Sequence, residues 1–98
     1  MKKYETIVIL DEKSIDDDGS KFMKDFEEVI TKQLGGKVLE TVIMGRKQFA
    51  QEIKRKKTGI YLDVVHEMDA DKVIELRDTY KLNETVLRMQ VYNYDRPE

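Results

Sequence analysis

A short apolar segment is followed by apolar residues spaced three or four apart, and this succession is repeated later in the chain. Residues 4–10 are mostly β-branched and apolar, which is typical of a strand. The acidic residues 16–18 carry helix-starting signals, because negative charge is favoured at a helix N-terminus. The apolar residues that follow predict one buried helix face. This face consists of Phe22, Phe26, Val29, Ile30 and Leu34. Gly35-Gly36 is expected to end the helix, since glycine adopts the left-handed conformation without strain.

The middle of the chain predicts two strands joined by a basic segment. Residues 38–43 favour a second strand, which is expected to bend at Gly45 and to continue as far as residue 53. Residues 54–59 predict a basic turn. Residues 60–68 predict a third strand, because their apolar side chains alternate onto one face.

The last third of the chain predicts one more helix and one more strand. Asp69 is expected to cap the second helix, whose buried residues are Val73, Leu76 and Tyr80. Residues 85–92 predict the fourth strand, and residues 95–98 are expected to fray. The order β-α-β-β-α-β predicts an α+β, ferredoxin-like domain over residues 1–94. Its four-stranded antiparallel sheet would carry both helices on one face, with the first and third strands in the centre.

Such a sheet has one face that the helices leave uncovered. Alternation along the strands assigns apolar, aromatic and charged side chains to this face, which together suggest a contact surface. The assigned residues are Glu5, Ile7, Ile9, Tyr61, Asp63, Val65, Glu67, Arg88, Gln90 and Tyr92. Within this set the predicted protein-binding residues are Ile7, Ile9, Tyr61, Val65 and Tyr92.

The net charge of −2 conceals a strong segregation of charge along the chain. Residues 35–60 carry 7 basic and 2 acidic groups, whereas residues 1–34 carry 6 and 9, and residues 61–98 carry 5 and 9. Because salt screens charges beyond about 8–10 Å, a local basic patch attracts phosphate despite the negative total. A solvated loop is the alternative interpretation. The negative total favours a protein that adds contacts within an assembly over a free-standing RNA binder.

Candidate catalytic groups are few. The chain has no cysteine. Its one histidine, His66, falls at a position of the third strand whose side chain is expected to face the helices and to be packed there. The segment Asp11-Glu12-Lys13-Ser14 stands where an enzyme of this fold would bind phosphate, and its acidic residues repel phosphate. We therefore expect no catalysis, no cofactor, no metal and no small-molecule substrate. The longest apolar run, residues 7–10, is too short to cross a membrane, and a cytoplasmic location is expected.

Four short motifs, in order and across nearly the whole chain, resemble the bacterial small-subunit (30S) ribosomal protein S6 family. They are Lys2-Lys3-Tyr4-Glu5, Gly45-Arg46-Lys47-Gln48-Phe49-Ala50, Lys57-Thr58-Gly59-Ile60-Tyr61 and Leu82-Asn83-Glu84-Thr85-Val86-Leu87-Arg88. The chain departs from the family pattern at Gln51-Glu52, where relatives carry Tyr-Pro. The resemblance implies a ferredoxin-like fold and a structural role in the small ribosomal subunit, with binding to 16S-type rRNA together with ribosomal protein S18.

The predicted RNA-binding residues come from the resemblance and from the basic segment. The resemblance implies Lys2, Lys3, Arg46, Lys47 and Arg88; charge density adds Lys54 and Lys56, and Tyr4 is a candidate for stacking on a base or for packing at the sheet edge. The alternative hypothesis is a regulatory or self-associating module that binds a small ligand or a protein through its open sheet face. Little response of RNA binding to changes at Lys47 or Arg88 would favour that alternative.

Overall fold

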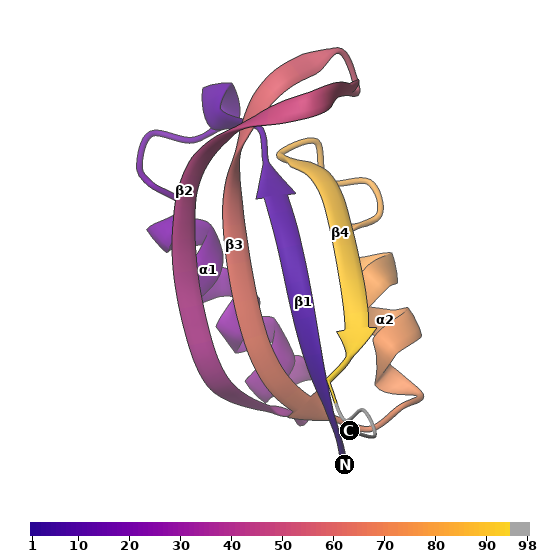
Figure 1. The fold of residues 1–98 in the computed structure, drawn as a ribbon. Helices are drawn as coiled ribbons and strands as arrows, with labels where there is room; N and C mark the ends of the chain where they lie inside the picture. Colours follow the sequence, from indigo (N-terminus) through magenta and orange to yellow (C-terminus); the bar gives the residue numbers. More distant parts are fainter. Residues whose placement is uncertain (95–98) are drawn as a thin grey trace.

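The computed structural model describes residues 1–94 and shows a four-stranded antiparallel sheet with two helices on one face (Figure 1). The strand order is β2-β3-β1-β4, so β1 and β3 are central, and the predicted ferredoxin-like fold is confirmed. The elements are β1 (Lys2–Leu10), α1 (Ser20–Glu28), β2 (Lys37–Ile53), β3 (Lys56–Met68), α2 (Lys72–Tyr80) and β4 (Val86–Asn93). The predicted frayed tail, residues 95–98, lies outside the described residues.

The core lies between the sheet and the helices. Val8 of β1 pairs with Leu62 of β3, and both side chains are fully buried. They share one apolar cluster with Phe26 of α1 and Leu76 of α2. The side chains of β1 and β3 that were predicted to face the helices therefore do so. In a sheet covered on one face, side chains along each strand alternate between the covered and the open face.

Helix α1 begins where the acidic residues predict and ends at the predicted glycines. Asp17 accepts hydrogen bonds from the backbone N–H groups of Gly19 (2.9 Å) and Lys21 (3.0 Å), which satisfies donors that the first turn leaves free. The helix continues into a π-helical turn, Val29–Gln33. The backbone N–H of Gly36 donates to the Ile30 carbonyl (2.8 Å), and a Cβ at Gly36 would lie 2.4 Å from a backbone carbonyl of β3. Only glycine fits this close approach.

Three details of the predicted elements are wrong. Met23 is buried in α1, whereas Phe22 is only partly buried at the margin of the core. Helix α2 begins after Asp71 and not after Asp69, the predicted cap. The backbone carbonyl of Asp69 accepts a hydrogen bond from the Lys72 N–H (2.9 Å), but its side chain does not cap the helix. Residues 56–59 belong to β3, and the turn is confined to residues 54 and 55, whose φ angles are positive, as in a tight hairpin. A polar strand end is easily mistaken for a loop, because it lacks the apolar alternation that marks a strand.

The β2–β3 hairpin bends over the adjacent ends of β1 and β4 (Figure 1). Its register shifts between Ile43 and Gly45, where Gly45 has a φ of +89°, which confirms the predicted bend. At the tip, Lys54 Nζ donates to the Val86 carbonyl of β4 (3.5 Å). Behind the tip Phe49 comes close to Gly59 and Ile9, since a Cβ on Gly59 would lie 2.8 Å from Phe49 Cζ and 2.9 Å from Ile9 Cγ2. The bend therefore places an aromatic ring over the end of the open face.

Candidate nucleic-acid and protein interface

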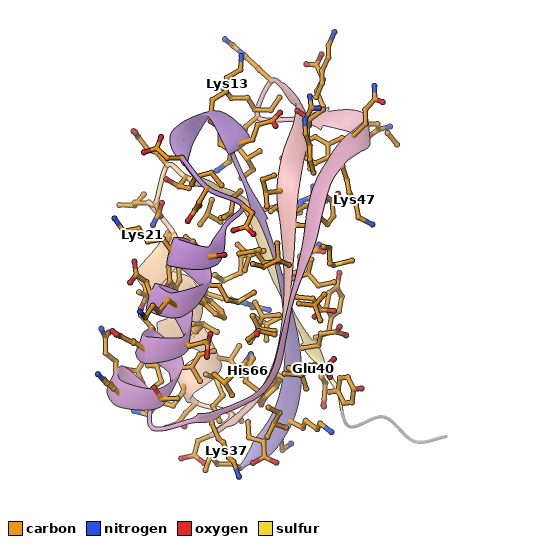
Figure 2. All side chains as sticks on the ribbon, turned by 90° about the vertical axis from the view of Figure 1, so that its left-hand side faces the viewer. Lys13, Lys21, Lys37, Glu40, Lys47 and His66 are labelled. Carbon is orange, nitrogen blue, oxygen red and sulfur yellow. The ribbon has the colours of Figure 1, made fainter. Side chains whose placement is uncertain are left out.

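The open face of the sheet carries the residues that the strand parity predicts. Ile9 stands between Tyr61 of β3 and Arg88 of β4, and Glu5 stands between Val65 and Tyr92. Edge strand β2 adds Glu40 and Lys47, whose partners on β3 are Val65 and Gly59. Figure 2 shows Lys47 on the side of the sheet away from the helices, whereas Lys21 lies on the helix side.

One end of this face is basic and aromatic. Lys47 Nζ lies 5.7 Å from the centre of the Tyr61 ring, within the range of cation–π attraction. The rings of Tyr61 and Phe49 have their centres 6.1 Å apart at an angle of 53°. Arg88 lines the same hollow as these two rings. The structure thus brings Lys47 and Arg88, two predicted RNA-binding residues, to the same end as Tyr61, which the sequence assigned to a protein contact.

The opposite half of the open face is acidic. Glu5, Glu40 and Asp63 line a hollow of about 180 Å³ together with Val65 and Tyr94. Desolvation, a hydrogen bond with Glu5 and repulsion from Glu5 raise the pKa of Asp63 to about 6. These carboxylates come from three different strands. Their proximity depends on the register in which the strands pair, which the sequence alone does not give. A positively charged side chain of a partner would relieve their mutual repulsion.

Lys2 and Lys3 do not belong to the basic end. Lys3 pairs with Glu67 near one end of β3, while Ile9 pairs with Tyr61 six residues further along β1, which corresponds to about 20 Å at about 3.3 Å per residue. Lys3 Nζ lies 4.6 Å from the centre of the Tyr94 ring. Lys2 is exposed. The predicted RNA-binding lysines of the N-terminus therefore form a second, separate basic position.

Arg46 points to the opposite face of the sheet from Lys47, because neighbouring residues of a strand alternate. Its Nε lies 2.8 Å from Glu12 Oε2, and the Arg46 side chain is 65% exposed. A hydrogen bond from the Thr58 hydroxyl, together with Arg46, lowers the pKa of Glu12. Of the predicted RNA-binding residues Arg46, Lys47 and Arg88, Arg46 therefore lies on the other face of the sheet from Lys47 and Arg88, and its charge is partly neutralised.

The basic segment at residues 54–59 is also partly neutralised. Lys56 Nζ lies 3.4 Å from Asp11 Oδ2. Desolvation raises the pKa of Asp11, but a hydrogen bond from the Lys13 backbone N–H and the charge of Lys56 outweigh it, and the net shift is downward. Lys54 is bound to the Val86 carbonyl. The acidic segment that the sequence analysis treated only as repelling phosphate also pairs with part of the predicted RNA-binding set.

Two further site residues are buried. Tyr4 is 8% exposed and belongs to the core, with its ring 6.0 Å from the ring of His66, so packing and not stacking on a base describes its position. Ile9 is on the open face as predicted, yet it is only 5% exposed, with Phe49 folded close to it. Neither side chain is open to a partner. Of the other predicted protein-binding residues, Tyr92 is exposed, Ile7 is half-buried and Val65 is also buried.

His66 is packed beneath the sheet, as its parity predicts. Its side chain is fully buried, and its Nε2 lies 2.7 Å from Thr6 Oγ1. Burial lowers the pKa of His66 to about 4, so the ring is neutral at physiological pH. Within residues 1–94 no three histidine or carboxylate side chains are grouped to hold a metal ion. No helix in the described part of the chain is long and apolar enough to span a membrane.

A ferredoxin-like sheet with an open face that is basic and aromatic at one end and acidic at the other defines a binding domain. Comparison with known proteins gives its family: the profile of the family described as "Ribosomal protein S6" matches residues 3–93. The chain therefore belongs to the ribosomal protein S6 family. This is a family of structural proteins of the small ribosomal subunit and not of enzymes, which confirms the expected class and cytoplasmic location.

Individual relatives agree with this assignment. The chain is 36% identical over 96 residues to "Small ribosomal subunit protein bS6" of Helicobacter acinonychis, covering 97% of this chain and 66% of that protein. It therefore spans slightly less than two thirds of the length of that relative. It is 34% identical to the protein of the same name from Corynebacterium aurimucosum, covering 97% and 98% of the two chains. The crystal structure of 30S ribosomal protein S6 from Thermotoga maritima shares the fold, with a TM-score of 0.86, 23% identity and coverage of 93% and 85%.

Proposed function

We propose that this chain is a structural constituent of the small ribosomal subunit that binds 16S-type rRNA together with ribosomal protein S18. The observation that carries the proposal is the polarity of the open sheet face. Lys47 and Arg88 stand at one end beside exposed polar residues, and Glu5, Glu40 and Asp63 gather in the other half. Opposite charges on one face suit two partners of opposite charge, one of them a nucleic acid.

The RNA would contact the basic end. Lys47 and Arg88 are exposed, and no ion pair with a described carboxylate neutralises either of them. Each phosphate contact releases counterions, so a surface with so few cations gives affinity that falls steeply with salt and needs support from a second protein. Lys2 and Lys3 would add phosphate contacts at the far end of β1. The chain's net charge of −2 agrees with binding inside an assembly.

The protein partner would contact the acidic half. Tyr92, which is exposed, and Ile7, which is half-buried, supply apolar surface there, and the carboxylates of Glu5, Glu40 and Asp63 lie beside it. An apolar centre with a charged rim is the usual arrangement of a protein contact, and its charge selects a partner with basic side chains. A protein that also binds rRNA phosphates provides such side chains. The resemblance to the S6 family suggests S18 for this position.

The RNA part is tested by reversing charge at the basic end. Lys47→Glu combined with Arg88→Glu should keep the fold and weaken binding to a labelled small-subunit rRNA fragment about 10-fold or more at physiological salt. The matched control is Lys21→Glu combined with Lys24→Glu, which makes the same change of net charge on exposed positions of α1. Equal losses from both double variants would show that only net charge matters and would contradict a site at the basic end.

The protein part is tested separately by titrating the chain with purified S18 in the absence of RNA. Glu40→Lys should weaken this pairing, because a cation in the acidic hollow repels a basic partner. Glu28→Lys, at an exposed position of α1, makes the same charge change away from the sheet and should have little effect. Unchanged pairing in Glu40→Lys would exclude the acidic half as the protein contact.

A further inference from the structure

The hollow beneath the bent hairpin has the features of a small binding site. It measures about 370 Å³, within the range of roughly 300–1,000 Å³ typical of ligand sites. Phe49 and Tyr61 form aromatic walls, and Arg88, Gln51 and Glu52 bring polar groups to it. Both rings are half-buried, so part of each remains accessible.

We propose that this hollow receives one unpaired nucleobase of the bound RNA, which rests on the RNA-binding role proposed above. The rings of Phe49 and Tyr61 are inclined at 53°, so they do not stack on each other in parallel and a planar base can lie against one of them. Aromatic stacking of this kind contributes roughly 5- to 150-fold in affinity per base and accepts any base. Base-paired RNA does not offer such a base, whereas loops, bulges and ends do.

Two cations stand where the phosphates of that nucleotide would pass. Lys47 Nζ lies 5.7 Å from the Tyr61 ring centre, and Arg88 lines the hollow itself. An aromatic ring with cations beside it matches the alternation of base and phosphate along a single strand. An apolar protein side chain would use the rings but would leave both cations without partners. The observations therefore favour RNA over a protein segment as the occupant.

Glu52 gives the site an orientation. Glu52 is one of the residues that line the hollow, and a carboxylate at this place would repel phosphate and accept hydrogen bonds from the N–H groups on the edge of a base. Gln51, the preceding residue of β2, also lines the hollow, and its side-chain amide has both donor and acceptor groups. The base edge is thus directed into the hollow, and the backbone is directed outward to Lys47 and Arg88.

The aromatic wall is held in place before any ligand binds. Gly59 has no side chain, and a Cβ there would lie 2.8 Å from Phe49 Cζ, so the ring packs directly against the backbone of β3. The hairpin tip is tied to β4 by the contact between Lys54 Nζ and the Val86 carbonyl. A preformed site loses less conformational entropy on binding than a mobile loop.

The test compares a single-stranded oligoribonucleotide with an abasic oligomer of the same length, which keeps the phosphates and lacks the bases. The wild-type chain should bind the base-bearing oligomer at least 5-fold more tightly. Tyr61→Ala should remove this preference for the base-bearing oligomer, and Tyr61→Phe should retain it. Tyr61→Leu keeps the apolar bulk without the ring, so it tests the ring even if the alanine variant is unstable.

Each outcome has a distinct meaning. Equal binding of the two oligomers by the wild-type chain, or a preference that survives in both Tyr61→Ala and Tyr61→Leu, would overturn the nucleobase site while leaving phosphate-mediated RNA binding intact. Both oligomers are tested with S18 present, because the proposed RNA binding is shared with that protein. Loss of binding to both oligomers in the Lys47→Glu, Arg88→Glu double variant supports the basic end, and failure of the wild-type chain to bind either oligomer in the presence of S18 refutes both proposals. If the Tyr61 variants weaken only the pairing with S18, the hollow is a protein contact and the proposal is wrong.

Discussion

Acidification should destabilise this protein through one buried side chain, His66. The imidazole is fully buried, its Nε2 is bonded to Thr6, and its Nδ1 has no hydrogen-bond partner among residues 1–94. A second proton on the ring would therefore be buried without a counter-charge. Burial accordingly lowers the pKa of His66 from 6.5 to about 4 in the folded chain.

The sign and size of the effect follow from linkage. Above pH 6.5 the ring is neutral in both states and contributes nothing to the pH dependence. Between pH 6.5 and 4 the unfolded chain binds a proton that the folded chain does not, so the free energy of unfolding decreases as the pH falls. At 1.36 kcal/mol per pKa unit the full loss is roughly 3 kcal/mol, of which about 2 kcal/mol is already present at pH 5.

Asp63 acts in the opposite direction over the same range. Its pKa is raised from 3.8 to about 6, so the folded chain holds a proton there that the unfolded chain releases, and acidification stabilises the fold through this group. The assay therefore uses an Asp63→Asn background. Urea unfolding is compared at pH 7.5 and pH 5 with His66 present and with His66→Gln, which keeps a polar group near Thr6 but does not titrate. The variant should lose about 2 kcal/mol less stability between the two pH values than its parent. Equal losses in the two proteins would refute a neutral, buried His66.

Three other predictions concern the core, the end of α1 and the two faces of β2. Phe26→Ala should reduce the free energy of unfolding by about 3–5 kcal/mol in urea titrations, because the side chain is fully buried; a nearly unchanged midpoint would contradict its place in the core. Gly36→Ala should cost about 1–3 kcal/mol and more than Gly35→Ala, since only at Gly36 would the new Cβ meet a backbone carbonyl; the reverse order in thermal unfolding would be inconsistent with this packing. Arg46→Ala should weaken binding to the rRNA fragment less than Lys47→Ala, because Arg46 faces the helix side and pairs with Glu12, and equal effects would count against the assignment of faces.

The strand parity of β1 and β3 could be predicted from the sequence, because helices cover only one face of both strands and most of their residues alternate between buried and partly exposed. The same parity places Tyr4 with Thr6 and Val8 on the covered face, so the sequence contained a signal for the burial of Tyr4, in favour of packing over stacking on a base. Adjacent residues of a strand point in opposite directions, which already separates Arg46 from Lys47. Which of the two is on the open face depends on the register shift at Gly45.

The contacts that arise where the β2–β3 hairpin bends over the sheet could not be predicted from the sequence. No local pattern shows that the hairpin end folds over the sheet, places Phe49 next to Ile9 and closes a hollow with Tyr61 and Arg88. The acidic half of the open face was missed for a related reason. Glu5, Glu40 and Asp63 are far apart along the chain and meet only through the pairing of β1, β2 and β3.

The central position of β1 bears on the synthesis of the chain. Residues of β1 leave the ribosome before their two neighbours in the sheet, which are β3, residues 56–68, and β4, residues 86–93. Until those segments emerge, the apolar side chains and the backbone hydrogen-bonding groups of β1 have no native partner. Such a strand is prone to pair with other chains or to be held by a chaperone during translation. Synonymous changes that slow translation between residues 68 and 86 should therefore prolong the interval in which one side of β1 is unpaired, and should lower the soluble yield.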